Sequence, residues 1–298
     1  MKNILIPLAL MITTFVFAKD SPSTHDIPLK NSLLWKISGK DITKPSYLYG
    51  TMHLVCGDEF ITKSKVQNAI SNTDILYLEV DMDDPSLMSD MMGLMSSSKK
   101  IKDIEDDKIK QQFLELAAET FSMNKSMLEN SPLFNIMSML AYKAMPSCDI
   151  ATSGVDEQLM TVYTKLKKDI YGLETIQEQM EFITKSGMFD PEVLIKSLQE
   201  FDLMKDIFVD MVDVYSEENI RDLFLLMATP NEYTTQQEIE KILDFLLLKR
   251  NANWVAKIPS IAKEQPTFFG VGAGHLGGDI GVINLLRLQG YTVEAVMN

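Results

Sequence analysis

The chain has 298 residues, of which 46% are hydrophobic and 23% are charged, and its formal net charge is -14. These values are typical of a globular protein that can bury a core, and they exclude disorder and collagen-like repeats. The acidic balance repels phosphate backbones, so we expect no nucleic-acid partner. Histidine occurs only three times and cysteine only twice, so each can be considered individually.

The first eighteen residues have the features of a secretory signal peptide. Lys2 precedes an apolar run from residue 4 to 18, with small residues where cleavage before Lys19 requires them. A retained membrane anchor is the alternative, but this run is short for a span of roughly 20 residues. A polar linker, residues 19–31, follows and contains His25, which we expect to be solvated. We therefore expect an exported protein, periplasmic or secreted, with no membrane span in the mature chain.

Both cysteines belong to the predicted mature chain. In an oxidising compartment a disulfide between Cys56 and Cys148 is chemically allowed. Two buried free thiols are the alternative, and the sequence does not decide between them.

The N-terminal part alternates between strand and helix signals. Residues 33–38 and 46–49 read as two strands of a hairpin, with turn residues between them. A helix is predicted over residues 61–72, and the aliphatic run at 75–80 predicts a buried strand.

The middle of the chain, about residues 85–262, is predicted to be mostly helical. Eleven of the 20 methionines lie between Met82 and Met160. Methionine fills irregular gaps between packed helices, which is the simpler explanation. A Met-rich groove that adapts to peptide ligands is the alternative. A short strand at residues 169–173 interrupts the helices.

The C-terminal segment returns to the α/β pattern. A strand at residues 267–271 leads through a glycine-rich turn to a helix at 280–289 and a last strand at 292–296. We therefore predict an α/β (α+β) fold in residues 32–298. Its central mixed sheet would be built from the N- and C-terminal segments, with two related halves and a large helical insertion.

Two of the three histidines lie in the same local pattern. Gly50 precedes His53 by three residues after one predicted strand, and Gly272 precedes His275 in the same way after another. Glycine lets the chain turn sharply at a strand end, so that each imidazole points into the crevice at the sheet edge. Two neutral imidazoles that converge there indicate a metal site.

Glu79 is the carboxylate best placed to complete that site. It follows an apolar run and lies at the end of a buried strand, where an unpaired charge would be costly. We expect a cation beside it, either a metal ion or an arginine; a lysine partner is the structural alternative.

The turn at residues 272–277 also matches the dinucleotide-binding pattern G-x-G-x-x-G, with Glu294 near the position of a ribose-binding acid. Too little sequence follows it for the remaining strands of a dinucleotide domain. We therefore do not expect this activity.

Arg250 and Asn251 end an apolar run just before the late strand. Arg250 is suited to stabilising negative charge on a substrate, or else is a surface cation at a helix end. Glu174 follows a strand and a glycine, which by itself suggests a cap or turn.

These motifs together resemble the TraB/GumN family, which includes the Tiki proteins. The resemblance covers nearly the whole mature chain. It rests on six segments in the family's order: residues 50–54, 76–79, 154–156, 172–175, 250–251 and 271–276. It implies a fold with two related halves and a divalent-metal peptidase site formed by His53, Glu79 and His275. It also implies a site role for Arg250 and Asn251.

The expected function is an exported metal-dependent peptidase that hydrolyses peptide or protein substrates. His53, Glu79 and His275 would hold Mn²⁺, Co²⁺ or Zn²⁺, with Glu79 acting either as a ligand or as the base. Arg250 and Asn251 would stabilise the oxyanion. Glu174 would carry a proton or support the site. The alternatives are a non-catalytic protein that sequesters a peptide and a protein that binds haem or iron through the two histidines.

Overall fold

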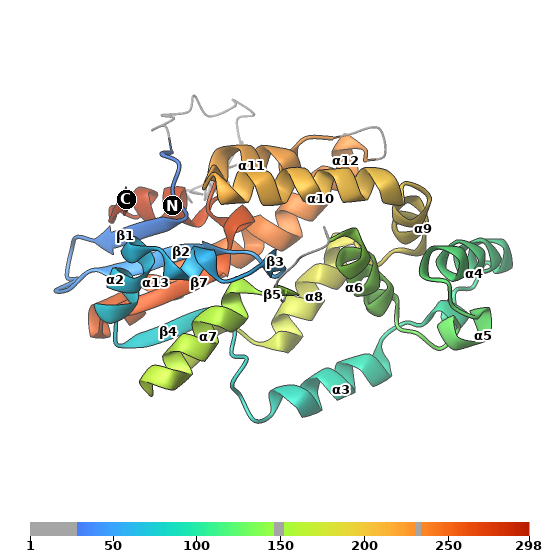
Figure 1. The fold of residues 1–298 in the computed structure, drawn as a ribbon, viewed down its shortest axis with the longest axis horizontal. Helices are drawn as coiled ribbons and strands as arrows, with labels where there is room; N and C mark the ends of the chain where they lie inside the picture. The colour runs from blue at the N-terminus through green and yellow to red at the C-terminus, as the bar shows by residue number, and fades with distance from the viewer. Residues whose placement is uncertain (1–28, 146–151, 231–233, 298) are drawn as a thin grey trace, which may run out of the picture.

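A six-stranded mixed sheet forms the centre of the protein (Figure 1). The computed structural model describes residues 29–145, 152–230 and 234–297. The strand order is β6-β4-β7-β2-β1-β8. Its strands are β1 (Leu34–Ser38), β2 (Ser46–Thr51), β4 (Ile75–Val80), β6 (Ile170–Glu174), β7 (Thr267–Gly272) and β8 (Thr292–Ala295).

Four neighbouring strands, β6, β4, β7 and β2, run parallel, whereas β1 pairs antiparallel with both β2 and β8. The predicted hairpin and the other predicted strands are confirmed. The sheet also takes β6 from the middle of the chain, so it is not built from the terminal segments alone. A small second sheet pairs β3 (Val55–Cys56) with β5 (Thr152–Ser153).

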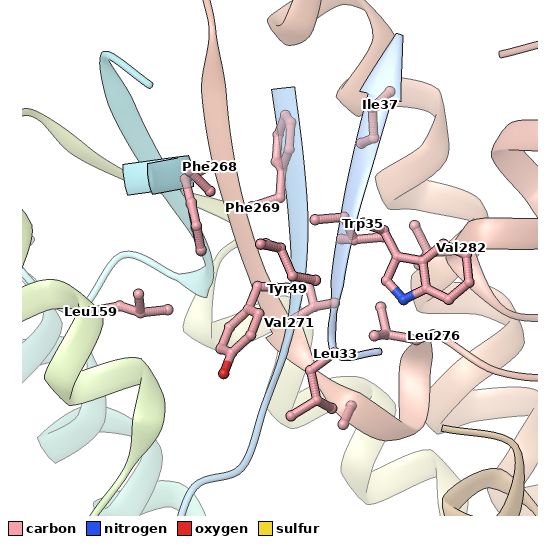
Figure 2. Packing of buried hydrophobic residues seen from close by; sticks show 14 of the residues in the cluster. Leu33, Trp35, Ile37, Tyr49, Leu159, Phe268, Phe269, Val271, Leu276 and Val282 are labelled. Carbon is pink, nitrogen blue, oxygen red and sulfur yellow. The ribbon is translucent and has the colours of Figure 1, made fainter. Parts of the chain in front are cut away.

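Helices cover the sheet, and its core contains large side chains. Phe268 lies toward Leu159 of α7, whereas Trp35 lies beside Val282 of α14 and Leu276 (Figure 2). The C-terminal segment therefore fills one part of the core and the helix after β5 fills another. The helices near the sheet are α1 (Glu59–Thr62), α2 (Ser64–Ser71), α7 (Val155–Leu166), α13 (Lys249–Glu264), the short turn η3 (Ala273–His275) and α14 (Val282–Leu288).

The predicted helical middle region has an apolar core of its own. Phe113, Leu128, Leu140 and Leu194 are buried in it, and α4 and α5 lie well away from the sheet (Figure 1). Besides α7 and α13, the helices of this region are α3 (Leu87–Ser97), η1 (Ile101–Asp103), α4 (Asp107–Phe121), α5 (Lys125–Leu128), α6 (Leu133–Ala144), α8 (Ile176–Ser186), α9 (Pro191–Gln199), α10 (Phe201–Ser216), α11 (Ile220–Ala228), α12 (Gln236–Ile242) and the π-helical segment η2 (Leu243–Leu248).

The methionines of the middle region are divided between interior and surface. Met137 and Met204 pack against the helical core, as gap-filling predicts. In α3, however, no residue is buried, and Met88 and Met92 are 72% and 64% exposed. Core packing therefore explains only part of the methionine content.

Several sequence predictions fall outside the described residues: the leader at 1–18, most of the linker with His25, and Cys148. Cys56 is disulfide-bonded. Within the described ranges, no helix is both long and apolar enough to cross a membrane.

Candidate functional site

The predicted site residues gather at the carboxyl ends of the four parallel strands. Glu174 is the last residue of β6, and Glu79 is the penultimate residue of β4. His275 follows β7 by three residues, and His53 follows β2 by two. Because these strands are neighbours in the sheet, residues far apart in the sequence meet at one edge, where α/β proteins generally bind ligands.

Glu79 lies at the centre of a hydrogen-bonded cluster. Its Oε2 accepts from Arg250 Nη2 at 2.5 Å and from Gln179 Nε2 at 3.0 Å. Its Oε1 accepts from the backbone N–H of Gly272 at 2.7 Å. Burial would raise the pKa of Glu79, but the positive charge of Arg250 and the other contacts hold it well below the usual range. The carboxylate is thus buried and ionised, with the cation expected from the sequence beside it.

Arg250 is buried. The alternative prediction, a surface cation at a helix end, is therefore wrong. It follows the π-helical segment η2 and lies in the first turn of α13. Its Nε donates to Glu174 Oε1 at 2.9 Å, and its Nη2 donates to the same atom at 2.6 Å. One guanidinium therefore neutralises two buried carboxylates, Glu174 and Glu79.

Trp254 lies one turn after Arg250 on α13 and supports the same cluster. Its ring centroid lies 4.8 Å from the guanidinium carbon of Arg250 and 4.5 Å from the ring centroid of His275. Its Nε1 donates to Glu174 Oε2 at 3.2 Å. With Arg250 and Trp254 both bonded to it, Glu174 holds α13 against the end of β6.

Asn251 fixes the orientation of His275. The Asn251 amide nitrogen donates to the Ile280 carbonyl at 2.7 Å, so its Oδ1 is the acceptor that faces His275 Nδ1 at 2.6 Å. Nδ1 of His275 therefore carries the proton, and Nε2 has a lone pair. Burial lowers the pKa of His275 to about 3, so the imidazole is neutral at physiological pH.

The lone pair of His275 already has a partner. Arg250 Nη1 lies 3.1 Å from His275 Nε2, and Glu79 Oε1 lies 3.7 Å from the same atom. Arg250 thus occupies the place beside Glu79 and His275 where a second cation would lie, so this contact must open before Nε2 can bind another group.

His53, which follows the neighbouring strand β2, is held in the same way, but it is exposed. Its Nδ1 lies 2.9 Å from Oδ2 of Asp156, which belongs to the first turn of α7. That hydrogen bond raises the pKa of His53. The Nε2 atom of His53 is the one directed away from this contact. His53 and Glu79 line one pocket, whereas His275 is not part of its wall.

The donor set fits a divalent ion in chemistry, although not as a closed cluster in this arrangement. Histidine ligands commonly have their second nitrogen held by a side-chain or backbone oxygen, as both histidines do here. Nevertheless, no group of three or more His, Cys, Asp or Glu side chains among the described residues is placed to hold a metal ion. Arg250 is the cation that the structure shows at this place.

The comparisons with known proteins agree with this arrangement of motifs. The TraB/PrgY/gumN family matches residues 33–295, which is most of the chain. The chain belongs to the TraB/PrgY/gumN family. The resemblance seen in the sequence motifs is thereby confirmed.

Curated relatives from this family are named metalloproteases. Metalloprotease TIKI1 of Danio rerio is 26% identical over 89% of this chain and 63% of its own length. Metalloprotease TIKI1 of Homo sapiens is 25% identical over 96% of the chain and 67% of its length. Metalloprotease TIKI2 of Xenopus tropicalis is 23% identical over 89% of this chain and 60% of its own length. The chain thus spans about two thirds of the length of these relatives. No solved structure matches it.

The glycines of the two TraB/PrgY/gumN histidine motifs have a different role from the one predicted. Neither Gly50 nor Gly272 has a positive φ, so conformational freedom is not the reason for glycine. A Cβ on Gly50 would lie 2.8 Å from Leu276 Cδ1, and one on Gly272 would lie 3.2 Å from Glu79 Oε1. A side chain at Gly50 would therefore require its neighbours to move, and one at Gly272 would crowd the Glu79 carboxylate.

Three residues of the site were not identified from the sequence: Asp156, Gln179 and Trp254. Asp156 belongs to the segment 154–156 of the family resemblance, but no role was assigned to it, because its partner His53 lies 103 residues away in the sequence. Trp254 had a usable signal, since it follows Arg250 by four residues and so shares its helix face. For Gln179 the sequence carried no signal that we can identify.

Proposed function

We propose that this member of the TraB/PrgY/gumN family is an exported metal-dependent peptidase, with His53, Glu79 and His275 as the residues that hold a divalent ion. One observation carries the proposal. After the ends of two neighbouring parallel strands, each histidine has its Nδ1 held by a side-chain oxygen, Asp156 for His53 and Asn251 for His275. Glu79 lies 3.7 Å from His275 and lines the same pocket as His53. The naming of the relatives as metalloproteases supports it.

Within this proposal the buried groups have distinct tasks. Asp156 and Asn251 hold the two imidazoles in the tautomer that presents Nε2. A bound divalent ion would supply Lewis-acid chemistry, which polarises a peptide carbonyl and promotes ionisation of water. Once its contact with His275 Nε2 has opened, Arg250 supplies a positive charge for the negative charge that develops on the carbonyl oxygen. Glu174 keeps Arg250 in place, which is the supporting role that the sequence allowed as an alternative to proton transfer.

Glu79 has two roles that remain compatible with the proposal. As a ligand it would complete a set of three with the histidines. As a base it would accept a proton from water, and the ion would then have two protein ligands. Against the effect of burial, the neighbouring positive charge of Arg250 lowers the pKa of Glu79 and keeps it ionised, which suits the ligand role, because a metal ion binds the carboxylate form.

Export and domain boundaries are part of the same proposal. We assign residues 1–18 as a leader, 19–31 as a linker and 32–298 as the catalytic domain, with a periplasmic or secreted mature protein.

The direct test is cleavage of unstructured peptides. The wild-type protein is loaded separately with Mn²⁺, Co²⁺ and Zn²⁺, and products are identified by mass spectrometry. We expect cleavage by wild type with at least one metal and none by His53→Ala. His25→Ala is the matched control, because it removes the third histidine, and it should cleave as wild type does. Equal cleavage by wild type and His53→Ala would contradict the proposal.

A non-catalytic protein that sequesters a peptide is the second candidate, favoured by the exposed methionines of α3. Met88 and Met92 lie four residues apart on one helix face and are largely exposed. Such flexible apolar surfaces adapt to varied peptides. A peptide complex recovered uncut after long incubation with metal would favour this candidate over the peptidase.

A further inference from the structure

A pocket of about 340 Å³ opens beside His53 and Glu79. Its apolar side chains come from three parts of the fold. Leu78 and Val80 are contributed by β4, Met82 by the segment after β4, and Met160 by α7. The volume lies at the lower end of the range for ligand pockets, roughly 300–1,000 Å³, which suits one large side chain rather than an extended molecule.

The walls of this pocket are mostly apolar or acidic. Leu78, Val80, Met82 and Met160 supply its hydrophobic surface. Glu79, Asp156 and Glu157 add three carboxylates, against a single basic group, the imidazole of His53. Neither lysine nor arginine is among the described residues that line the pocket. A carboxylate side chain entering the pocket would lose hydration and meet like charge, whereas an apolar side chain would gain from burial.

Two of the four apolar wall residues are methionines. Met82 is 53% exposed, and Met160 packs on the margin of the sheet core. Methionine has three flexible bonds, so such walls adjust to side chains of different shape. The pocket is therefore suited to leucine, methionine and phenylalanine alike, with little selection among them.

We propose that this pocket receives a large apolar side chain of the peptide, from the residue next to the bond that is cut, and that Met82 and Met160 set this preference. The inference rests on the proposed peptidase function, since it assigns a substrate class to the same site. The substrate class is an unstructured peptide with Leu, Met or Phe at that residue, and Asp or Glu there is rejected.

The test is a peptide series on a constant background of glycine and serine. One central residue is varied among Leu, Met, Phe, Ala, Asp and Glu, and wild-type protein with its active metal is assayed by mass spectrometry. We expect cleavage beside the varied residue, with kcat/KM for the Leu, Met and Phe peptides about tenfold or more above that for Asp and Glu. Equal rates for Leu and Asp would overturn the inference while leaving the peptidase function intact.

Met82→Lys tests the wall itself, because it places a cation at the pocket on a side chain that is already half exposed. We expect the ratio of kcat/KM between the Leu and Asp peptides to fall about tenfold, mostly through KM. Met127→Lys is the matched control, since Met127 is similarly exposed, at 61%, but lies on α5 and does not line the pocket. An unchanged ratio in Met82→Lys would overturn the assignment.

Absence of any cleavage by wild type would reject the peptidase function. The apolar preference of the pocket would then be tested by peptide binding alone. Fluorescence anisotropy with labelled Leu and Asp peptides should show tighter binding of the Leu peptide, with the difference reduced in Met82→Lys. Equal binding of both peptides would overturn the pocket assignment as well.

Discussion

Asn251 Oδ1 accepts a hydrogen bond from Nδ1 of His275 at 2.6 Å, in the interior of the protein. The amide also donates to the Ile280 carbonyl, so it ties the turn after β7 to α13. One buried side chain thereby sets both the tautomer of His275 and the position of the segment that carries it.

Replacing Asn251 by alanine should lower the free energy of unfolding by about 1–3 kcal/mol. The variant leaves the His275 Nδ1 proton and the Ile280 carbonyl buried without their partner. Urea denaturation followed by circular dichroism measures the change. Asn72→Ala is the control, because Asn72 is exposed, and its effect should stay within about 0.5 kcal/mol. Similar stability of the two variants would show that the buried amide is not needed.

Replacing Arg250 by alanine should be more costly, about 3–5 kcal/mol, because Glu79 and Glu174 would be left buried without their cation. The exposed Arg221 provides a matched control as Arg221→Ala. Adding Glu79→Gln and Glu174→Gln to Arg250→Ala should recover part of the loss, since the uncompensated charges are then removed. No recovery in the triple variant would mean that packing, rather than charge, sets the cost.

Gly154→Ala should disturb the contact between His53 and Asp156. A Cβ at position 154 would lie 2.7 Å from the backbone oxygen of His53, so the backbone must move. We expect a loss of about 1–3 kcal/mol in stability and reduced peptide cleavage. Gly93→Ala, in α3, has open space around the added Cβ and should be neutral or stabilising. A Gly154→Ala variant that cleaves as wild type does would contradict this role.

Glu218 should contribute to stability against acid. Burial raises its pKa, but hydrogen bonds from Lys63, Lys65 and the Leu33 N–H outweigh burial and lower the pKa below its ordinary value of 4.5. The unfolded chain therefore binds the proton more readily than the folded chain. The stabilising contribution is present above pH 4.5 and is lost as the pH falls through the lower folded value.

Glu218→Gln should thus be less stable than wild type near neutral pH, and the difference should shrink as the pH falls below 4.5. Thermal unfolding between pH 3 and pH 7 measures the difference. The exposed Glu217 next to it gives the control, Glu217→Gln. A difference that stays constant over this range would rule out the ionised Glu218 as its source.

The sequence predicted those features of the site that depend on residues close together in the chain. The apolar run before Glu79 indicated a buried anion that needs a cation, and Arg250 is that cation. The two Gly-x-x-His motifs predicted histidines at strand ends. The order of the parallel strands is not visible in local patterns, because it depends on how distant segments pack. For this reason neither the partnership of Asp156 with His53 nor the place of β6 beside β4 was identified.

The predicted reason for glycine in the two Gly-x-x-His motifs was wrong, again because it considered only local sequence. Conformational freedom at Gly50 and Gly272 is a local property and was the natural inference. The structure shows instead that residues from other elements, Leu276 and Glu79, crowd the space that a side chain would occupy there. Such crowding becomes visible only when the strands are in place.

The most direct test of the proposed function is the metal content of the purified protein. Wild type and the double variant His53→Ala/His275→Ala would be purified without chelators and measured by elemental analysis, with circular dichroism to show that both are folded. We predict about one divalent ion per chain in wild type and none in the folded double variant. The same metal content in both proteins, or no metal in wild type even after loading, would contradict the proposed site.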